Sequence, residues 1–176
     1  MSASVFCGTS LDGFIARRDD ALDFLPDDGG EPHGFDEFFS SVDVLVIGRR
    51  TFDKVMTFDA WPYGDKRVVV LSHGRVDLSR LAGFPVAVME GAPPDILASL
   101  EADGASHAYI DGGVTIQAFL RAGLIQTLTV TRVPVLIGDG IPLFGSLPQD
   151  LRLRHIATTS YASGLVKSAY EVLITP

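Results

Sequence analysis

Apolar and polar positions along the chain follow two periods, and the period changes from one segment to the next. Residues 43–48 (DVLVIG) form a nearly continuous apolar run, which is typical of a strand buried on both faces. Residues 35–42 (FDEFFSSV) instead space their apolar side chains along one face of a helix. The alternation continues, and it predicts strands at 4–8, 43–48, 66–72, 84–90 and 107–111 and helices at 35–42, 50–57, 94–102 and 114–123.

The C-terminal part of the chain loses the helical period. Residues 125–138 begin a run of strands, and residues 151–161 and 164–174 alternate around Ala162-Ser163-Gly164, which predicts a terminal hairpin. Strands separated by helices pair in parallel, whereas the strands of a hairpin pair antiparallel. We therefore expect an α/β fold with a mixed, mainly parallel sheet, helices on both faces and a C-terminal antiparallel hairpin, folded as one domain over residues 1–176.

Composition restricts the partners that this fold can have. The 176 residues are 47% hydrophobic, and 14 Lys and Arg stand against 22 Asp and Glu, for a formal net charge of −8. Such a surface repels phosphate backbones and anionic lipids, so we expect no nucleic-acid and no membrane partner. Residues 1–20 lack the basic region and long apolar core of a signal peptide, and no later apolar run is long enough for a membrane helix.

Cysteine and histidine usage argues against a metal centre. Cys7 is the only cysteine in the sequence, which excludes an intrachain disulfide and a four-thiolate metal site and fits a reducing, cytoplasmic setting. The histidines are scattered without metal-ligand spacing, at His33, His73, His107 and His155. We therefore predict no metal site.

Residues 25–34 (LPDDGGEPHG) are rich in Gly, Pro and Asp and interrupt the pattern of strands and helices. A lid over a binding site and a plain surface connection both remain open for this segment.

The strand predicted at 43–48 ends at Gly48, and Arg49 and Arg50 follow at the start of a predicted helix. At such a junction the free backbone N–H groups and the positive end of the helix dipole point toward an anion. Two solvated arginines at the start of a helix would give the same sequence. The pattern alone therefore leaves a phosphate site and an ordinary surface equally open.

A second glycine turn lies in residues 109–116 (YIDGGVTI), where Gly112 and Gly113 separate a strand from a helix. Paired glycines let another backbone or a pyrophosphate approach closely, because no Cβ intervenes. Two such turns in one sheet predict one extended ligand with phosphates in its middle, although each turn alone is equally explained by its backbone angles. Neither turn matches the G-x-G-x-x-G fingerprint or a P-loop.

Three carboxylates are candidates for proton transfer: Asp12, Asp36 and Asp111. Each is also explained as a turn or cap residue. No serine occupies a G-x-S-x-G elbow, so nucleophilic serine chemistry has no support in the sequence.

Five segments occur in the order expected of one family: TSLDGFIA, VIGRRTF, VVVLSH, YIDGGVTIQAFLRAGLI and TVTRVPVLIGDGIPLF. On these segments the chain resembles the dihydrofolate reductase-like superfamily. Within it, the chain is similar to the group that includes the reductase domain of the riboflavin-biosynthesis protein RibD and its small stand-alone relatives. The resemblance runs from about Ser4 to the terminal hairpin. It implies a three-layer αβα fold, an NADPH-dependent reductase acting on a small-molecule substrate, and assembly as a homodimer.

The resemblance also implies that both glycine turns bind NADPH. The first turn would hold the pyrophosphate and 2′-phosphate side, the strand end at 71–73 would wall the adenosine half, and the second turn would grip the pyrophosphate through a cis Gly112–Gly113 bond. The backbone at residues 8 and 15 would meet the nicotinamide carboxamide. The implied cofactor-binding residues are Gly8, Ile15, Gly48, Arg49, Arg50, Thr51, Leu71, Ser72, His73, Gly112, Gly113, Val114 and Thr115.

For the substrate, the resemblance points first to riboflavin biosynthesis. In riboflavin-type reductases the aspartate of the SLDG segment and an acidic residue before the glycine pair face the substrate, and Asp12 and Asp111 match these positions. Thr131 is the further residue expected at the substrate. Residues 53–67 lack the threonine-valine and aspartate-proline pattern of these enzymes, and the chain has no deaminase domain.

Folate reductases provide the second substrate candidate. There a helix carboxylate donates the proton and an arginine holds the glutamate tail, and Pro32 and Lys66 occupy the two positions here. Asp36 or Glu31 would have to replace the acid. A ribosylaminouracil phosphate therefore ranks first as the substrate, dihydrofolate second and another small carbonyl or imine third. The non-enzymatic alternative is an NADPH-binding module without turnover.

Overall fold

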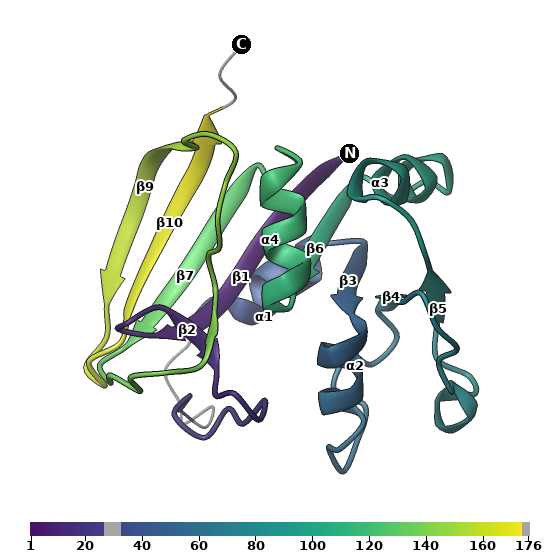
Figure 1. The fold of residues 1–176 in the computed structure, drawn as a ribbon, viewed down its shortest axis with the longest axis horizontal. Helices are drawn as coiled ribbons and strands as arrows, with labels where there is room; N and C mark the ends of the chain where they lie inside the picture. The colour runs from purple at the N-terminus through teal and green to yellow at the C-terminus, as the bar shows by residue number, and fades with distance from the viewer. Residues whose placement is uncertain (27–32, 174–176) are drawn as a thin grey trace.

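The computed structural model describes residues 1–26 and 33–173, and its central element is an eight-stranded sheet with the order β5-β4-β3-β6-β1-β7-β10-β9 (Figure 1). The strands from β5 to β7 in this order are parallel, and β10 and β9 add antiparallel pairs at one edge. The predicted mixed sheet with a C-terminal hairpin is thus confirmed. The strands are β1 (Ser2–Ser10), β3 (Val44–Gly48), β4 (Arg67–Leu71), β5 (Val86–Met89), β6 (His107–Asp111), β7 (Thr127–Val133), β9 (Arg152–Ser160) and β10 (Val166–Leu173).

Helices cover both faces of this sheet, because successive residues of the buried strands point to opposite sides. On β3, Val46 packs into a core with Phe119 of α4, whereas Ile47 packs into a second core with Phe52 of α2. Helix α3 joins the first core and α1 the second, which confirms the three-layer arrangement. No helix in the described ranges is long and apolar enough to cross a bilayer. The helices are α1 (Phe35–Ser41), α2 (Arg49–Val55), α3 (Pro93–Ala102) and α4 (Gly113–Arg121).

Three short elements were not predicted from the sequence. Strands β2 (Phe14–Ala16) and β8 (Ile141–Pro142) form a separate two-stranded sheet, and η1 (Ser79–Leu81) is a single 3-10 turn. Strand β7, the first of the predicted run, ends at Val133, because Pro134 has no N–H to donate to a neighbouring strand. Of the predicted lid or loop at 25–34, residues 27–32 lie outside the described residues.

The parallel pairing brings the carboxyl ends of five strands to the same end of the sheet, its carboxyl edge: β4, β3, β6, β1 and β7. Both glycine turns lie at this edge, because α2 begins directly after β3 and α4 begins two residues after β6. In open α/β sheets this is the edge at which ligands bind.

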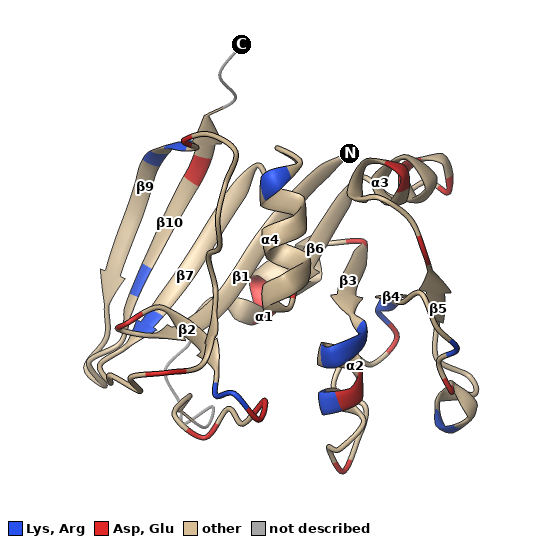
Figure 2. Ribbon diagram, viewed as in Figure 1, with Lys and Arg blue, Asp and Glu red and all other residues tan. Residues whose placement is uncertain are grey.

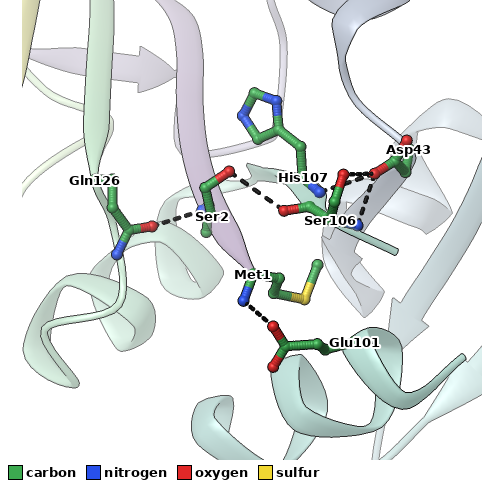
Figure 3. A network of polar contacts seen from close by, with 8 residues as sticks. Met1, Ser2, Asp43, Glu101, Ser106, His107 and Gln126 are labelled. Atoms are coloured by element: carbon green, nitrogen blue, oxygen red, sulfur yellow. Dashed lines mark hydrogen bonds and ion pairs between the residues drawn. The ribbon is translucent and has the colours of Figure 1, made fainter. Parts of the chain in front are cut away.

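The opposite edge is held by a polar network around Asp43, which directly precedes β3 (Figure 3). Its carboxylate accepts hydrogen bonds from Ser106 N and Oγ, both at 2.7 Å, and from His107 N at 2.9 Å. These bonds stabilise the ionised carboxylate and lower the pKa of Asp43 to about 2. The bond from the Ser106 hydroxyl has the largest effect. The network therefore ties the start of β3 to the start of β6 away from the ligand-binding edge.

We expect this network to make the free energy of unfolding depend on pH below about 4. Because the pKa of Asp43 is lower in the folded chain than its ordinary value of 3.8, its contribution is complete above 3.8 and is lost as the pH falls through about 2. Asp43 is exposed, so solvent screening limits this contribution to about 1 kcal/mol. Urea unfolding of the wild type and Asp43→Asn should differ at pH 6 and converge at pH 2. A constant difference across this range would contradict the assignment.

Candidate active site

A cleft of about 780 Å³ runs along the carboxyl edge of the sheet. It extends from the ends of β4 and β5, past the two glycine turns after β3 and β6, to the ends of β1 and β7. Every residue that the family resemblance implies for the cofactor lines this cleft, as do Asp111 and Thr131. The sequence-based set is therefore brought together in space, apart from two of its three carboxylates.

The two glycine turns lie against each other because β3 and β6 are neighbours, with Ile47 paired to Asp111. A Cβ added at Gly48 would lie 2.6 Å from Thr115 Oγ1, and one added at Gly112 would overlap Thr51 Oγ1. Each turn thus receives the threonine hydroxyl of the other helix. Glycine is required at both positions by this close approach, and at Gly112 also by a φ of 92°.

The peptide bond between Gly112 and Gly113 was expected to be cis, and the structure corrects this. Cis peptide bonds are absent from the described part of the chain. The positive φ of Gly112, 92° with a ψ of 132°, makes the turn from β6 into α4 with a trans bond. The Gly-Gly pair therefore acts through the left-handed backbone of Gly112 and not through peptide isomerism.

We expect Gly48→Ala to lower the free energy of unfolding by about 1–3 kcal/mol, the usual cost of overpacking, because the methyl group meets Thr115 Oγ1. The φ of Gly48, −77°, suits alanine, so Thr115→Ala should restore most of the loss in the double variant. Gly112→Ala should be rescued less by Thr51→Ala, because the φ of 92° still costs about 1–2 kcal/mol. Denaturant unfolding of the two double-mutant cycles measures this, and strictly additive changes at 48 and 115 would contradict the contact.

The glycine turns leave backbone donors available for an anion. Neither α2 nor α4 has a side chain that caps its N-terminus by a hydrogen bond. The first N–H groups of a helix have no partner within the helix, and the dipole places partial positive charge beside them. At α4, Gly113, Val114 and Thr115 supply these groups at the wall of the cleft. A phosphate or pyrophosphate fits this position.

Arg49 and Arg50 lie at the start of α2, a helix on which Figure 2 shows positive and negative residues close together. Both arginines already have partners within the chain. Arg49 Nε donates to both carboxylate oxygens of Asp53 at 2.8 and 2.9 Å, and Arg50 Nε donates to Asp20 at 2.8 Å. Each guanidinium also donates once to a backbone carbonyl. Since a guanidinium has five N–H groups, both half-exposed arginines keep donors for a phosphate.

The far end of the cleft, beside β4 and β5, matches the implied adenosine side. Leu71, Ser72 and His73 line it together with Met89 of β5. The exposed His73 ring approaches Glu90 with its Nδ1 at 2.8 Å. This part of the cleft combines an apolar wall with polar groups at its rim.

Asp111, the last residue of β6, is the carboxylate at the centre of the cleft. Burial raises its pKa, and the opposing hydrogen bond from Gly112 N is weaker. The other carboxylates of the cleft wall, Asp20 and Glu90, face Arg50 and His73, whereas among the described residues Asp111 has no ion-pair partner. A buried carboxyl group without a cation retains its proton to higher pH, so Asp111 is suited to donate one.

Two further titratable side chains on the cleft wall interact electrostatically with Asp111. The phenol of Tyr63 has a pKa raised by burial and then by the Asp111 charge, and the same two causes raise the pKa of the Cys7 thiol. Tyr109 donates its hydroxyl to Phe6 O at 2.7 Å and also lines the cleft. Sequence reasoning missed all three residues: Cys7 and Tyr109 lie inside the strands predicted at 4–8 and 107–111, and Tyr63 lies between two predicted elements.

Asp12 and Asp36 do not belong to the cleft wall. Asp12 is exposed and accepts backbone hydrogen bonds from Ile137 N at 3.3 Å and Gly138 N at 2.8 Å. Its pKa is lowered by these bonds and foremost by the Ser10 side chain. Asp36 is exposed in the first turn of α1, where its negative charge interacts favourably with the positive end of the helix dipole. The structure therefore gives both residues local structural roles.

Thr131 of β7, expected at the substrate, lies on the cleft wall. It is 9% exposed, and its Oγ1 is buried without a hydrogen-bond partner among the described residues. Buried hydroxyl groups are nearly always hydrogen-bonded, so this atom is suited to a ligand group. His33 also lines the cleft, and its Nε2 is buried without a hydrogen-bond partner in the described part of the chain. His33 was not predicted to belong to the site.

Comparison with known proteins agrees with this fold. The family model of the RibD C-terminal domain matches residues 4–167. The uncharacterized protein YwjB of Bacillus subtilis (strain 168) is 32% identical over 165 residues, which cover 92% of each chain. A structure of a putative riboflavin biosynthesis protein from Shewanella sp. PV-4 is 39% identical with a TM-score of 0.91, and covers 99% of this chain and 100% of that one.

A more distant structure shows the same fold. Dihydrofolate reductase from Enterococcus faecalis, complexed with NADP(H), has 17% identity and a TM-score of 0.66, and the match covers 97% of this chain and 96% of that one. At this identity the likeness concerns the fold alone. The family model, in contrast, spans nearly the whole sequence. The chain belongs to the RibD C-terminal domain family.

Proposed function

We propose that this protein is an NADPH-dependent reductase that transfers a hydride to a C=O or C=N carbon of a small molecule bound in the cleft. The proposal depends above all on one observation: Asp111, a carboxyl group without an ion-pair partner among the described residues, lies directly before a glycine turn suited to a pyrophosphate. Family membership supports an oxidoreductase, and the NADP(H) in the Enterococcus reductase supports the choice of cofactor.

The residues of the cleft fit NADPH in three places. The uncapped start of α4 suits the pyrophosphate, Arg49 and Arg50 suit the 2′-phosphate, and the wall at residues 71–73 suits the adenosine. Gly8 and Ile15 would lie beside the nicotinamide, where an added Cβ at Gly8 would meet Leu25 Cδ2 at 2.9 Å. When bound, the cofactor supplies the hydride.

In this proposal Asp111 supplies the proton. Its raised pKa keeps the carboxyl protonated to higher pH, and the reduced product needs one proton for each hydride that it receives. The carboxylate then regains a proton from water. Tyr63, Tyr109 and Phe6 line the same cleft and would limit the access of water to the reacting carbon.

The family ranks a ribosylaminouracil phosphate, 5-amino-6-(5-phosphoribosylamino)uracil, as the first substrate to test. Dihydrofolate has less support. Asp36 does not line the cleft, and Lys66 donates to Val42 O at 2.6 Å without lining it. Glu31 and Pro32 lie outside the described residues and do not bear on this ranking.

Two measurements on the purified protein test the proposal. NADPH should raise the midpoint temperature of unfolding, and absorbance at 340 nm should fall when a suitable substrate is added. Absence of an NADPH-dependent thermal shift would contradict the cofactor site. Binding of NADPH without oxidation by any carbonyl or imine substrate, with Asp111→Asn indistinguishable from wild type, would favour the binding module.

A further inference from the structure

The direction of the Asp111 side chain decides on which face of the sheet a substrate can take its proton. Side chains alternate between the two faces along a strand. On β6, Ile110 packs into the first core with α4, and Tyr109 packs into the second core beside α1. Asp111 follows Ile110 and pairs with Ile47, which also belongs to the second core. Its carboxyl group therefore lies on the α1 face, opposite the face that α4 covers (Figure 1).

Aromatic rings line the cleft on the α1 face. Phe35 of α1 lies edge-on to Phe6 at 5.6 Å and to Tyr109 at 6.2 Å between ring centroids. Tyr63, from the connection between α2 and β4, packs against the second core and lines the same cleft. Such rings suit an aromatic or heterocyclic substrate. The hydroxyl groups of Tyr63 and Tyr109 thus lie on the same face as the Asp111 carboxyl group.

The two phenols differ in what they already bind. Tyr109 donates its hydroxyl to Phe6 O at 2.7 Å, so its proton is committed to the neighbouring strand. No described residue accepts a hydrogen bond from the Tyr63 hydroxyl. Burial raises the pKa of Tyr63 and the charge of Asp111 raises it further, so the phenol keeps its proton at neutral pH and lies within electrostatic reach of the carboxylate. Tyr63 is therefore the phenol that can donate to a ligand.

The position of Tyr63 is fixed by its ring and its backbone. Trp61 meets the ring edge-on at 5.0 Å, and Phe39 of α1 lies 6.2 Å away, between ring centroids. The chain turns directly afterwards, where Lys66 N donates to Tyr63 O at 3.0 Å. Lys66 Nζ in turn donates to Val42 O at 2.6 Å. None of these contacts involves the phenol hydroxyl, so its removal should leave the packing intact.

We propose that Tyr63 is a second catalytic residue of the cleft, and that its hydroxyl donates a hydrogen bond to the substrate oxygen or nitrogen that Asp111 protonates. The inference rests on the proposed reductase and adds a residue to its site. As the hydride reaches the C=O or C=N carbon, negative charge develops on the heteroatom, and a fixed donor beside it lowers the barrier. NADPH is oxidised to NADP⁺, the carbon gains the hydride, and the heteroatom gains the Asp111 proton. Tyr63 keeps its own proton throughout.

Tyr63→Phe tests this role, because it removes the hydroxyl and keeps the ring that packs against Trp61 and Phe39. Three substrates are offered to the wild type with NADPH: 5-amino-6-(5-phosphoribosylamino)uracil, dihydrofolate and acetophenone. With the one that is reduced fastest, kcat of Tyr63→Phe should fall about 10²-fold, the usual loss of one donor at a developing charge. KM should change far less, because the bond strengthens in the transition state.

Two controls separate the hydroxyl from packing. The affinity for NADPH, measured by fluorescence titration, and the midpoint temperature of unfolding should be the same in Tyr63→Phe and the wild type. Tyr170→Phe removes the hydroxyl of a half-buried tyrosine on β10 that does not line the cleft, and it should leave kcat unchanged.

A second background distinguishes contact with the substrate from support of Asp111. In Asp111→Asn, Tyr63→Phe should still slow single-turnover oxidation of NADPH by about tenfold or more, because the phenol acts on the substrate directly. A general acid gives a rate that falls as the pH rises through its pKa, and this fall should remain in Tyr63→Phe. The titratable groups that interact with Tyr63 are Asp111 and Tyr109, and burial keeps the Tyr109 phenol protonated.

Three results would overturn the inference. The first is a Tyr63→Phe variant with the kcat and KM of the wild type. The second is a loss that disappears in the Asp111→Asn background, which would make Tyr63 a positioning residue that acts through Asp111. The third is a loss of rate that is matched by equal losses of NADPH affinity or of thermal stability. Failure of the wild type to bind NADPH, or to oxidise it with any of the three substrates, would instead reject the proposed reductase and the inference with it.

Discussion

Replacing Asp111 by asparagine is expected to slow NADPH oxidation by about 10²- to 10⁴-fold, the range for loss of a general acid. Asparagine keeps the size and hydrogen-bonding shape of the side chain but has no proton to donate at the required acidity. NADPH binding should change little, because the glycine turn and the arginines remain. The measurement is single-turnover oxidation at 340 nm with saturating cofactor.

Asp12→Asn and Asp36→Asn are the matched comparisons, since each removes one carboxylate that the sequence also nominated. Both residues are exposed and lie outside the cleft wall, so we expect far smaller losses. A loss at Asp12 or Asp36 equal to that at Asp111 would place the proton donor elsewhere.

Two pH effects should accompany the Asp111 variant. Burial raises the pKa of Asp111, so the rate in the wild type should fall as the pH rises through that value, and this fall should be absent in Asp111→Asn.

The raised pKa of Asp111 also affects the free energy of unfolding, in the opposite direction to the lowered pKa of Asp43. The folded chain binds the proton more tightly than the unfolded chain, so stability is lost as the pH rises above 3.8. Asp111→Asn should therefore raise the midpoint temperature of unfolding at neutral pH.

The second large effect concerns cofactor choice. Arg49→Ala or Arg50→Ala should weaken NADPH binding by about 1.5–3 kcal/mol, or roughly 10- to 150-fold, the value of a charged hydrogen bond to phosphate. NADH has no 2′-phosphate, so its affinity should hardly change. Fluorescence titration with both cofactors measures the difference.

The ion pairs of these arginines require a control, because a variant also loses a contact within the chain. Asp20→Asn breaks the pair with Arg50 but leaves the guanidinium in place. If Arg50 binds phosphate, this variant should retain NADPH affinity. Equal weakening by Arg50→Ala and Asp20→Asn, or equal loss for NADPH and NADH, would assign the arginine to loop structure.

The sequence predicts the order of the main elements because their periods are long and distinct. The strand at 107–111 and the hairpin around residue 162 lie where the alternation indicated. Strands β2 and β8, with three and two residues, are too short to establish a period, and their pairing joins segments far apart in sequence.

Glycines and charged residues at the ends of strands could be selected as site candidates from the sequence. Other residues that line the cleft could not. Gly48 and Gly112 mark strand-to-helix turns directly. Asp12, Asp36 and Asp111 carry the same local signal, and only the placement of β6 in the middle of the sheet separates the third from the others. Thr131 and His33 are recognised by the absence of a partner, which is a property of packing and not of sequence pattern.

The contact between the two glycine turns has a consequence for redesign of the cofactor site. Gly48 faces Thr115, so a larger residue at 48 demands a smaller one at 115 on the other helix. Gly112 faces Thr51 in the same way, but its φ of 92° keeps glycine favoured there. In libraries that randomise only residues 48–51, the segment that contains the arginines, members that replace Gly48 should therefore be less stable. Because the residues at positions 48, 51, 112 and 115 contact one another across the two turns, their substitutions are interdependent. Changes of cofactor preference should arise more readily when all four positions are varied together.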